Sequence, residues 1–303
     1  MPRVSAVIPT RNRRALLTRA LSSIEAQHFR DFEIIVVDDG STDGTSSWLR
    51  TNRAVSLIEA GCSRGAAAAR NRGVERARGE IVAFLDDDDV WHPSYLEKQV
   101  AQLDRHPDAE CSVTAHLEID AAGGITMPDL RPLYHYDKPL THMLAECPIH
   151  TLSIVACRRS AFARVGSFDE GLAIVHDLDW HARLIASGGR TIRCSESLVA
   201  RSMPGGLVAR HRKWFAEETM VQQRHFASAR LSRAERRLVR TVRAMFFTRI
   251  ALAKGDLPFG LRRLAEALLL SPLAAIHIAT LKSFRRLSAN SRGVSESAAW
   301  KLA

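Results

Sequence analysis

The amino-acid sequence predicts an α/β protein: a mostly parallel, twisted sheet flanked by helices and followed by a basic helical region. Through the first 100 residues, short runs of apolar and β-branched residues alternate with segments of helical periodicity. This alternation is typical of a doubly wound sheet. Two of the apolar runs end in clusters of aspartate, and positive charge is concentrated in the last third of the chain.

The alternation predicts four strands and three intervening helices before residue 86. The strands are expected at residues 4–9, 32–37, 55–58 and 81–85. The last of them reads Ile-Val-Ala-Phe-Leu, an apolar run that indicates a fully buried strand. The first helix has apolar residues at helical spacing between Leu16 and Ile24, the second begins near Thr45, and Gly65 opens the third, which is rich in alanine.

From about residue 100 the chain changes character. A helix that starts near Pro93 and Ser94 is expected to continue to Leu103, and strands are expected at residues 109–120 and 150–157. Residues 121–124 read as a turn. The stretch over residues 126–145 contains proline and tyrosine in an irregular pattern, which indicates an insertion.

Charge divides the chain into two parts. Residues 1–200 contain 23 Lys and Arg against 27 Asp and Glu, a net charge of −4, whereas residues 201–303 contain 20 against 6, a net charge of +14. A chain of 303 residues forms one or two domains. We therefore expect a domain at residues 1–206, with halves at 1–100 and 101–206, and a basic helical region at residues 207–303 that is disordered from about residue 288.

The five cysteines are scattered, odd in number and without CxxC spacing. This pattern argues against a disulfide framework and against a zinc site, and it fits a reducing cytosol. The first ten residues lack a hydrophobic segment long enough for a signal peptide, so we expect a cytoplasmic protein.

Four consecutive aspartates, Asp86 to Asp89, follow the predicted strand at residues 81–85. Their mutual repulsion favours a bound cation, and ligands of open α/β sheets bind at this carboxyl edge. If strand geometry persisted, Asp86 and Asp88 would face one way and Asp87 and Asp89 the other. Carboxylates together with ligand phosphates suit Mg²⁺ or Mn²⁺. The alternative is an acidic loop without a cation; an EF-hand is excluded, because Val90 and Trp91 stand where its oxygen ligand and glycine are needed.

A second acidic turn, Asp38-Asp39-Gly40-Ser41, ends the predicted strand at residues 32–37. Its carboxylates are placed to accept hydrogen bonds from a base or ribose, although Asp, Gly and Ser are also ordinary turn residues. Two acidic turns at the same edge of one sheet favour a ligand site.

Together these segments resemble the family 2 glycosyltransferases of the GT-A fold. The resemblance covers roughly the first 200 residues and depends on the order and spacing of five segments: 7–10, 36–45, 69–73, 78–80 and 85–93. It implies transfer of a sugar from a nucleoside-diphosphate donor, most often a UDP-sugar, with Mn²⁺ or Mg²⁺ as cofactor. Residues 1–100 would form the nucleotide-sugar-binding half and residues 101–206 the acceptor half.

The resemblance also implies roles for individual residues. Asp39 would hydrogen-bond the nucleobase, in a pocket that Pro9 and Thr10 line. Asp88 would be the principal metal ligand of a DxD motif, with Asp86 beside the ribose and the metal. The nucleotide-binding set implied by the matched motifs is Pro9, Thr10, Arg11, Asp38, Asp39, Arg70, Asn71, Asp86 and Asp87.

The segment from Val175 to Leu184 carries the residue expected to be the catalytic base. An inverting transfer needs a carboxylate that takes the proton of the acceptor hydroxyl, and Asp177 matches the family's base. A helix N-terminus would favour its ionised form; the alternative is a helix cap only. The family usually has an acidic residue at the position of His176, so His176 is expected to affect the base or to contact the acceptor.

A further departure follows Arg201. Many relatives have a histidine two residues later that contacts the metal or diphosphate, and this chain has Met203. Arg201, His211 and the arginines beside His211 (Arg210 and Arg212) are therefore candidate diphosphate or acceptor contacts, with a solvated basic helix as the alternative.

The C-terminal region is read as arginine-rich helices over residues 207–253 and a helical hairpin over residues 257–287. Leu261, Leu264, Ala265 and Leu268 form one stripe, and Glu266, Pro272 and His277 argue against a membrane span. A basic amphipathic surface suits the cytoplasmic face of a membrane. A helical cap or a homo-oligomer contact is the alternative.

Parts of this sequence also suit three other functions. Nucleotidyl transfer would usually show a glycine-rich phosphate loop after the first strand, which residues 10–14 lack. Nucleic-acid binding by the +14 region is not expected, because Phe246 and Phe247 stand at core-like helical spacing. A catalytically silent relative that binds a nucleotide sugar is the third alternative.

Overall fold

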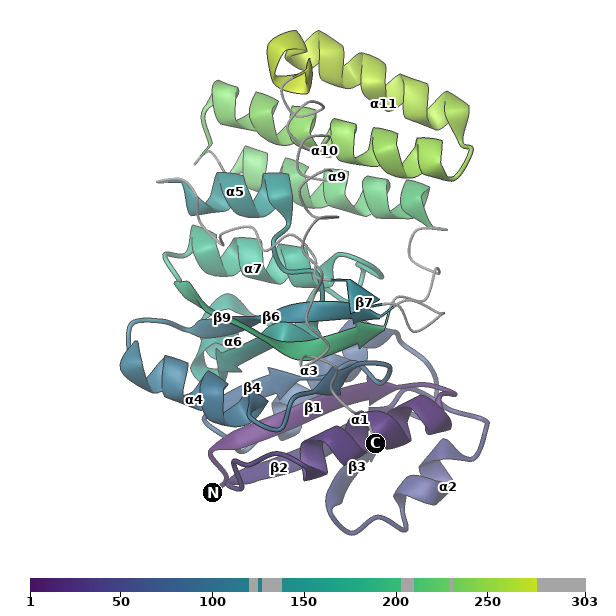
Figure 1. Ribbon diagram of the computed structural model, residues 1–303, viewed down its shortest axis with the longest axis vertical. Coiled ribbons are helices and arrows are strands. Elements are labelled where there is room, and N and C mark those ends of the chain that lie inside the picture. Colours follow the sequence, from purple (N-terminus) through teal and green to yellow (C-terminus); the bar gives the residue numbers. More distant parts are fainter. Residues whose placement is uncertain (120–124, 127–137, 203–209, 229–230, 277–303) are drawn as a thin grey trace. The chain divides into compact units, whose positions relative to one another are not determined.

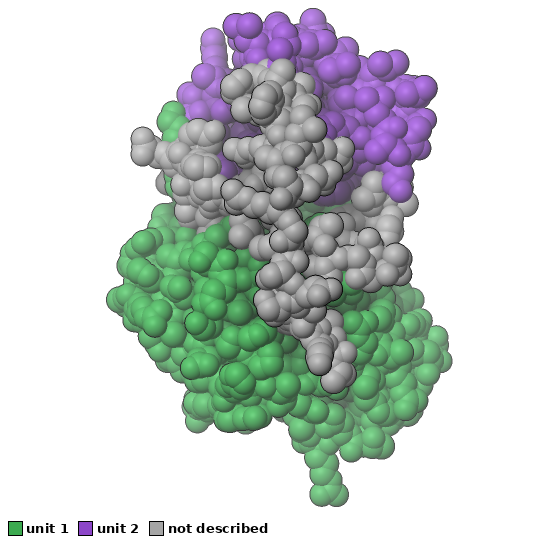
Figure 2. Space-filling model, viewed as in Figure 1, with its two compact units in different colours: residues 1–140, 147–204 green, residues 141–146, 205–303 purple. Residues whose placement is uncertain are grey.

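The computed structural model describes residues 1–119, 125–126, 138–202, 210–228 and 231–276. The chain divides into two compact units (Figure 2): residues 1–140 with 147–204, and residues 141–146 with 205–303. The expected turn at 121–124, most of the irregular stretch at 126–145 and the disordered tail from about residue 288 lie outside the described residues. The domain division expected at residue 206 stays a prediction.

The first unit is built on one mixed sheet with the strand order β3-β2-β1-β4-β8-β6-β9-β5, and β7 pairs with β6 (Figure 1). The predicted α/β fold with strands and helices in alternation is confirmed. Strands β1 (Val4–Thr10), β2 (Phe32–Asp38), β3 (Val55–Glu59) and β4 (Ile81–Phe84) are parallel neighbours. Every residue of β1 and β4 is buried, as expected for strands covered on both faces.

Antiparallel pairs enter beyond β4. Strand β8 (Val155–Arg158) pairs antiparallel with both β4 and β6 (Cys111–Ile119). The twelve-residue β9 (Thr191–Ser202) runs parallel to β6, with register shifts in the middle of the pairing, and β5 (Val90–Trp91) is antiparallel to β9. The two-residue β7 (Ile125–Thr126) completes the sheet.

Helices connect these strands in the first unit. They are α1 (Arg14–Glu25), α2 (Thr45–Leu49), α3 (Ala66–Arg76), α4 (Tyr95–Arg105), α6 (Arg159–Val165) and α7 (His176–Ala186), with a 3₁₀ turn at Leu152–Ile154. Helix α3 packs on β1 and β2, and α4 packs on β6 and β9. The approach of α3 to β1 requires Gly73, because a Cβ at this position would overlap the Val7 side chain.

An aromatic cluster anchors α7. Trp180 stacks on Phe162 with ring centroids 4.4 Å apart, and its indole N–H donates to the Gly166 carbonyl at 2.9 Å. Phe168 contacts both rings and also Phe84 of β4. Because these rings are almost fully buried, they fix the start of α7 relative to the sheet.

The second unit contains α9 (His211–Ala227), α10 (Arg233–Ala253) and α11 (Leu257–Leu270), which Figure 1 shows as successive helices, and most of α5 (Pro139–Glu146). Helix α10 begins with a capping box between Ser232 and Glu235. Glu235 also accepts a hydrogen bond from Thr141 of α5 at 3.0 Å. A segment about 60 residues earlier in the chain is thereby tied to this unit.

The stripe expected in α11 meets the core only at Leu264, which is partly buried and packs against a cluster that includes Ala244 and Ala267. The other three members, Leu261, Ala265 and Leu268, are exposed, whereas Gly260 and Arg263 are buried. The expected partner helix begins as a helical segment at residues 272–276, and the rest of the predicted hairpin lies outside the described residues. Among the helices that the structure describes, none has the length and apolarity to cross a bilayer.

Candidate active site

Three parallel strands end at the same edge of the sheet and bring the two acidic turns together. Thr10 at the end of β1 pairs with Asp38 at the end of β2. The Asp39 N–H donates to the Thr10 carbonyl at 2.9 Å, and the Thr10 hydroxyl donates to Asp87 at 2.8 Å. Pro9, paired with Val37, lies at the same edge.

The four aspartates after β4 form a turn, closed by a 3.1 Å hydrogen bond from the Asp89 N–H to the Asp86 carbonyl. The alternation expected for a continued strand is therefore wrong, because the chain leaves strand geometry at Leu85. Instead, the Thr151 hydroxyl lies between Asp86 and Asp89, 3.1 Å from an oxygen of the first and 3.3 Å from an oxygen of the second.

Asp87 and Asp88 share an arginine partner, Arg13, that was not predicted from the sequence. Nη1 of Arg13 lies 3.0 Å from an oxygen of Asp87 and 3.0 Å from an oxygen of Asp88. Burial still raises the pKa of both carboxyls above the ordinary value. Only the position of Arg13, in the loop that follows β1 at this edge of the sheet, could have indicated this contact.

Asp89 is the most deeply buried of the four. It accepts from the Ser153 hydroxyl at 2.6 Å and from the Ser202 N–H at 3.0 Å. Burial, followed by the neighbouring charges of Asp86 and Asp88, raises the pKa of Asp89 to about 8. Sequence reasoning missed these two serines, because each comes from a distant part of the chain.

Asp38 and Asp39 organise the loop that follows β2. The Ser41 N–H donates to Asp38 at 2.8 Å. Asp39 accepts from the Ser63 hydroxyl at 2.6 Å and from the Arg64 and Gly65 N–H groups at 2.8 and 2.9 Å. A carboxylate offers about four acceptor sites, so Asp39 retains capacity for one more donor.

Arg70 of α3 connects the acidic turn with the start of α7. Its Nη2 donates to Asp86, and its Nη1 lies 2.7 Å from Nε2 of His176. A guanidinium only donates, so this histidine nitrogen is the acceptor. Burial, with the positive charge of Arg70, lowers the pKa of His176 to about 3.

Asn71 contacts the protein at both ends of its amide. Its Nδ2 donates to the Phe168 carbonyl at 3.0 Å, and its Oδ1 accepts from the Phe168 N–H at 2.9 Å. The predicted nucleotide-binding residue thus links α3 to the loop before α7. Arg11, from the same predicted set, is exposed on the loop after β1.

Asp177 lies in the first turn of α7, as predicted. Its carboxylate accepts from the Leu178 N–H at 2.8 Å. Burial raises the pKa of Asp177 to about 6, although Arg70 opposes the shift. A carboxyl with this pKa is suited to accept a proton near neutral pH. In contrast, Asp179 pairs with Arg183 one turn later at 2.8 Å, as expected for a structural helix charge.

The remaining candidates fall in two places. Arg201, near the end of β9, lies 3.4 Å from Glu118, and its charge also acts on Asp86 and Asp89. His211 belongs to the second unit, where it and Arg212 both bind Asp256, at 2.8 and 2.7 Å.

The donor set at the acidic turn fits a divalent cation. Four carboxylates compete for the positive charge of Arg13, Arg70 and Arg201, and Asp88 is held partly exposed. Burial is the main cause of the raised pKa values of Asp87, Asp88 and Asp89, and a bound divalent cation would offset it. Oxygen-only ligands of this kind suit Mg²⁺ or Mn²⁺.

A mixed α/β sheet with paired acidic turns at the carboxyl edge of its parallel strands defines the GT-A class, and the chain is a glycosyltransferase. It belongs to glycosyl transferase family 2, whose family model matches residues 5–166.

The comparisons with individual proteins agree with this family. A GalNAc(5)-diNAcBac-PP-undecaprenol beta-1,3-glucosyltransferase of Campylobacter jejuni is 42% identical over 94 residues, which is 29% of this chain and 30% of that enzyme. An uncharacterized glycosyltransferase of Rickettsia typhi is 30% identical over 192 residues, 59% of this chain and 57% of that protein. The chain thus spans between about a third and somewhat over half of these curated relatives.

Solved structures show the same fold. A mannosyltransferase from Pyrobaculum calidifontis, solved in complex with GDP-Man and Mn²⁺, aligns with a TM-score of 0.62 at 23% identity. The alignment covers 93% of this chain and 80% of that one. The prediction of a family 2 glycosyltransferase of the GT-A fold is therefore confirmed.

Proposed function

We propose that this glycosyltransferase carries out a metal-dependent, inverting transfer of a sugar from a nucleoside-diphosphate donor, most readily a UDP-sugar, to a hydroxyl acceptor. The observation that carries the proposal is the contact chain from Asp86 through Arg70 to His176, the residue before Asp177. These contacts connect the acidic edge of the sheet, which suits a metal and a diphosphate, with helix α7. Helix α7 carries Asp177, whose pKa is about 6. The related mannosyltransferase structure contains GDP-Man and Mn²⁺.

In the proposed reaction, Asp177 accepts the proton of the acceptor hydroxyl while the acceptor oxygen attacks the anomeric carbon from the face opposite the leaving group. The bond between that carbon and the diphosphate oxygen breaks, and the nucleoside diphosphate leaves with the electron pair. The buried start of α7 holds the base, and His176 beside it, with a pKa lowered to about 3, is too weak a base to compete for the proton.

Asp88 and Asp86 would hold the cation, and Asp87 would support them through Arg13 and Thr10. The ion would neutralise charge that develops on the departing diphosphate. For the nucleotide, we assign the base to the pocket at Asp39, Pro9 and Thr10.

The name of one relative indicates a class of acceptor. The Campylobacter relative is named for action on an undecaprenol-linked glycan. We propose an acceptor of envelope-glycan type, a saccharide end or a lipid-linked glycan, with a peptide or small metabolite as alternatives. We also propose that the basic helical region, residues 207–303, binds the enzyme to the cytoplasmic face of a membrane.

Two features of the second unit support this location. Leu257, Leu261 and Leu269 of α11 are 56, 59 and 85% exposed, and Arg262 of the same helix is also exposed. Apolar and basic side chains on one surface helix suit anionic lipid. Sedimentation with vesicles that contain phosphatidylglycerol would test it: Leu261→Ser with Leu269→Ser should reduce binding, and equal binding by wild type and variant would contradict it.

Calorimetric titration tests the main proposal. The purified protein is titrated with UDP and with GDP, with and without Mn²⁺, and compared with Asp88→Ala and with the surface control Asp108→Ala. We expect metal-dependent binding of one nucleotide that Asp88→Ala abolishes and Asp108→Ala retains. Absence of binding to either nucleotide under every metal condition would contradict the proposal and favour a silent relative.

A further inference from the structure

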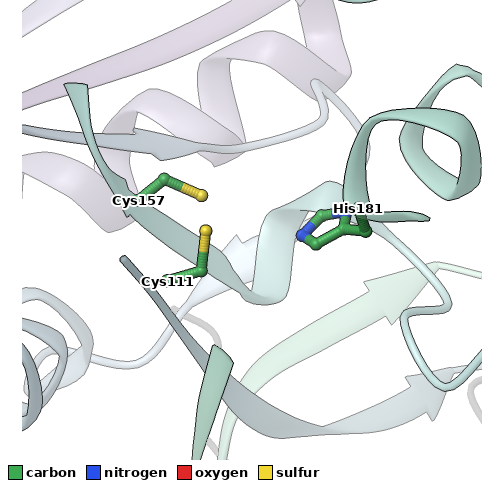
Figure 3. Close-up of side chains that lie close together, drawn as sticks. All are labelled: Cys111, Cys157 and His181. Carbon is green, nitrogen blue, oxygen red and sulfur yellow. The ribbon is translucent and has the colours of Figure 1, made fainter. Parts of the chain in front are cut away.

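Three side chains with metal-binding atoms meet inside the first unit, away from the acidic edge. Cys111 lies on β6, Cys157 on β8 and His181 on α7, and all three are fully buried, with an exposed fraction of 0%. Their ligand atoms lie within 4.8 Å of one another. In Figure 3 the two sulfur atoms face each other and a ring nitrogen of His181 points toward them.

The backbone itself holds the two cysteines together. Cys111 and Cys157 are directly opposite each other in the antiparallel pairing of β6 with β8. Side chains at opposite positions have Cβ atoms about 4.5–5.5 Å apart on the same face. Burial, and the neighbouring Cys157 thiol, raise the pKa of the Cys111 thiol well above its ordinary value. The sequence spacing of 46 residues hid this pair, because strand register brings it together.

His181 presents a lone pair to this thiol pair. Its Nδ1 lies 2.9 Å from the Asp177 carbonyl oxygen, which only accepts, so Nδ1 carries the proton. Burial lowers the pKa of His181 to about 4, which keeps the ring neutral. Nε2 is therefore an acceptor, and it has no hydrogen-bond partner among the described residues. An unsatisfied buried acceptor costs free energy unless something occupies it.

We propose that Cys111, Cys157 and His181 form a buried site for Zn²⁺. Two thiolates and a neutral imidazole make a complex with Zn²⁺ that has no net charge, which suits an apolar interior. Metal-ligating histidines usually donate their second ring N–H to a carbonyl or carboxylate, as His181 does to Asp177. Zn–S and Zn–N bonds of about 2.3 and 2.0 Å put tetrahedral ligand atoms ~3.7 Å apart, so the ligands need to close by up to about 1 Å.

Binding would release two protons. Each cysteine enters as a thiol and binds as a thiolate, while the imidazole binds through the lone pair it already has. Three protein ligands leave one tetrahedral position for a solvent molecule. The sulfur ligands separate this site chemically from the oxygen-only acidic turn, which suits harder ions.

The test uses the full-length, reduced and metal-stripped protein, with Co²⁺ as a spectroscopic probe and Zn²⁺ as its competitor. We expect one Co²⁺ per chain with a thiolate-to-cobalt charge-transfer band in the near ultraviolet, which one equivalent of Zn²⁺ removes. Zn²⁺ should release two protons per chain in weakly buffered solution and should raise Tm. Mg²⁺ in excess should leave the band unchanged.

Variants then locate the site. Cys157→Ala and His181→Gln should weaken Co²⁺ binding by at least about tenfold and change the band, whereas the matched controls Cys194→Ala (buried, on β9) and Cys62→Ala (exposed) should retain it. No thiolate band in the wild-type protein, or a band that survives Cys157→Ala, would overturn the proposal. So would a Cys111–Cys157 disulfide found by mass spectrometry in protein purified without reductant, because the ligands would then be oxidised. If a variant fails to fold, the wild-type titration still decides.

Discussion

Nη1 of Arg70 lies 2.7 Å from Nε2 of His176, and the other nitrogen of the same guanidinium fork binds Asp86. One side chain thus contacts the acidic turn and the residue that precedes Asp177. An acidic residue, which the family usually has in place of His176, would form an ion pair with this fork. Here the neutral histidine leaves the positive charge of Arg70 available to Asp86.

Replacing Arg70 tests this bridge. Arg70→Lys keeps the charge but loses the fork, so one of the two contacts must break. We expect kcat/KM to fall by about 10- to 100-fold, as for the loss of a charged hydrogen bond. Initial-rate kinetics would measure it, with Arg76→Lys, an exposed position on the same helix, as control. Equal kinetics for Arg70→Lys and wild type would show that the bridge is not needed.

The proposed role of Asp177 as the catalytic base predicts how catalysis depends on pH. Its pKa of about 6 predicts that kcat/KM falls below pH 6, because the protonated carboxyl cannot accept the acceptor's proton. Asp177→Asn should lower kcat by about 10²- to 10⁴-fold and abolish this acid limb while nucleotide binding persists. A pH–rate profile measured with the intact donor checks both effects. An acid limb retained in the variant would assign the base elsewhere.

Asp177 is also expected to affect stability, and in the opposite direction: activity should rise with pH, whereas stability should fall. Because the folded-state pKa is raised, the folded protein binds this proton more tightly than the unfolded chain does. Stability from this group is therefore greatest below about pH 4 and is lost as the pH rises toward 6. Asp177→Asn should then be at least as stable as wild type at pH 7.5 in thermal unfolding. A large drop in Tm would mean that the ionised carboxylate itself stabilises the fold.

The contact of α3 with β1 predicts a compensating pair. Gly73→Ala introduces a methyl group that overlaps Val7, which is fully buried, so it should destabilise the protein by about 1–3 kcal/mol. Val7→Ala removes the overlapping atoms, and the double variant should be more stable than the sum of the two single effects predicts. Denaturant unfolding of the four proteins measures the coupling, and additivity would contradict the contact.

In the second unit, Arg243 and Glu218 form a buried ion pair at 2.6 and 2.5 Å, and the guanidinium lies 4.1 Å from the Phe246 ring centroid. Glu218→Ala leaves Arg243 charged and unpaired, so we expect a loss of about 3–5 kcal/mol. Glu218→Leu combined with Arg243→Leu should cost less than Glu218→Ala alone. Tm values for this series, with the exposed Glu75→Ala as control, decide the order.

The parallel part of the fold was predictable because its strands are short, apolar and separated by clear turns. The strand over residues 191–202 was not predicted, since Arg193, Ser195 and Glu196 interrupt its apolar pattern. Its pairing with β6 shifts register at that point, which tolerates the interruption. Such irregular pairing leaves no periodic signal in one sequence.

At the site, sequence motifs located the acidic turns and the start of α7 but not the contacts that hold them. Arg13, Thr151 and Ser153 act on the aspartates through tertiary structure, and nothing in their local sequence marks them. Spacing also argued against a metal site at the cysteines. The register of β6 with β8 brings Cys111 and Cys157 together, and this register cannot be read from the spacing of cysteines in the sequence.

The chain passes between its two compact units three times, near residues 140, 146 and 204. Residues 141–146 leave the ribosome long before Glu235, their hydrogen-bond acceptor, is translated. At about 5–20 residues per second, this helix waits several seconds with Met143 and Leu144, both fully buried in the folded protein, still uncovered. Slowing translation after residue 146 should therefore lengthen this interval and increase aggregation of the nascent chain.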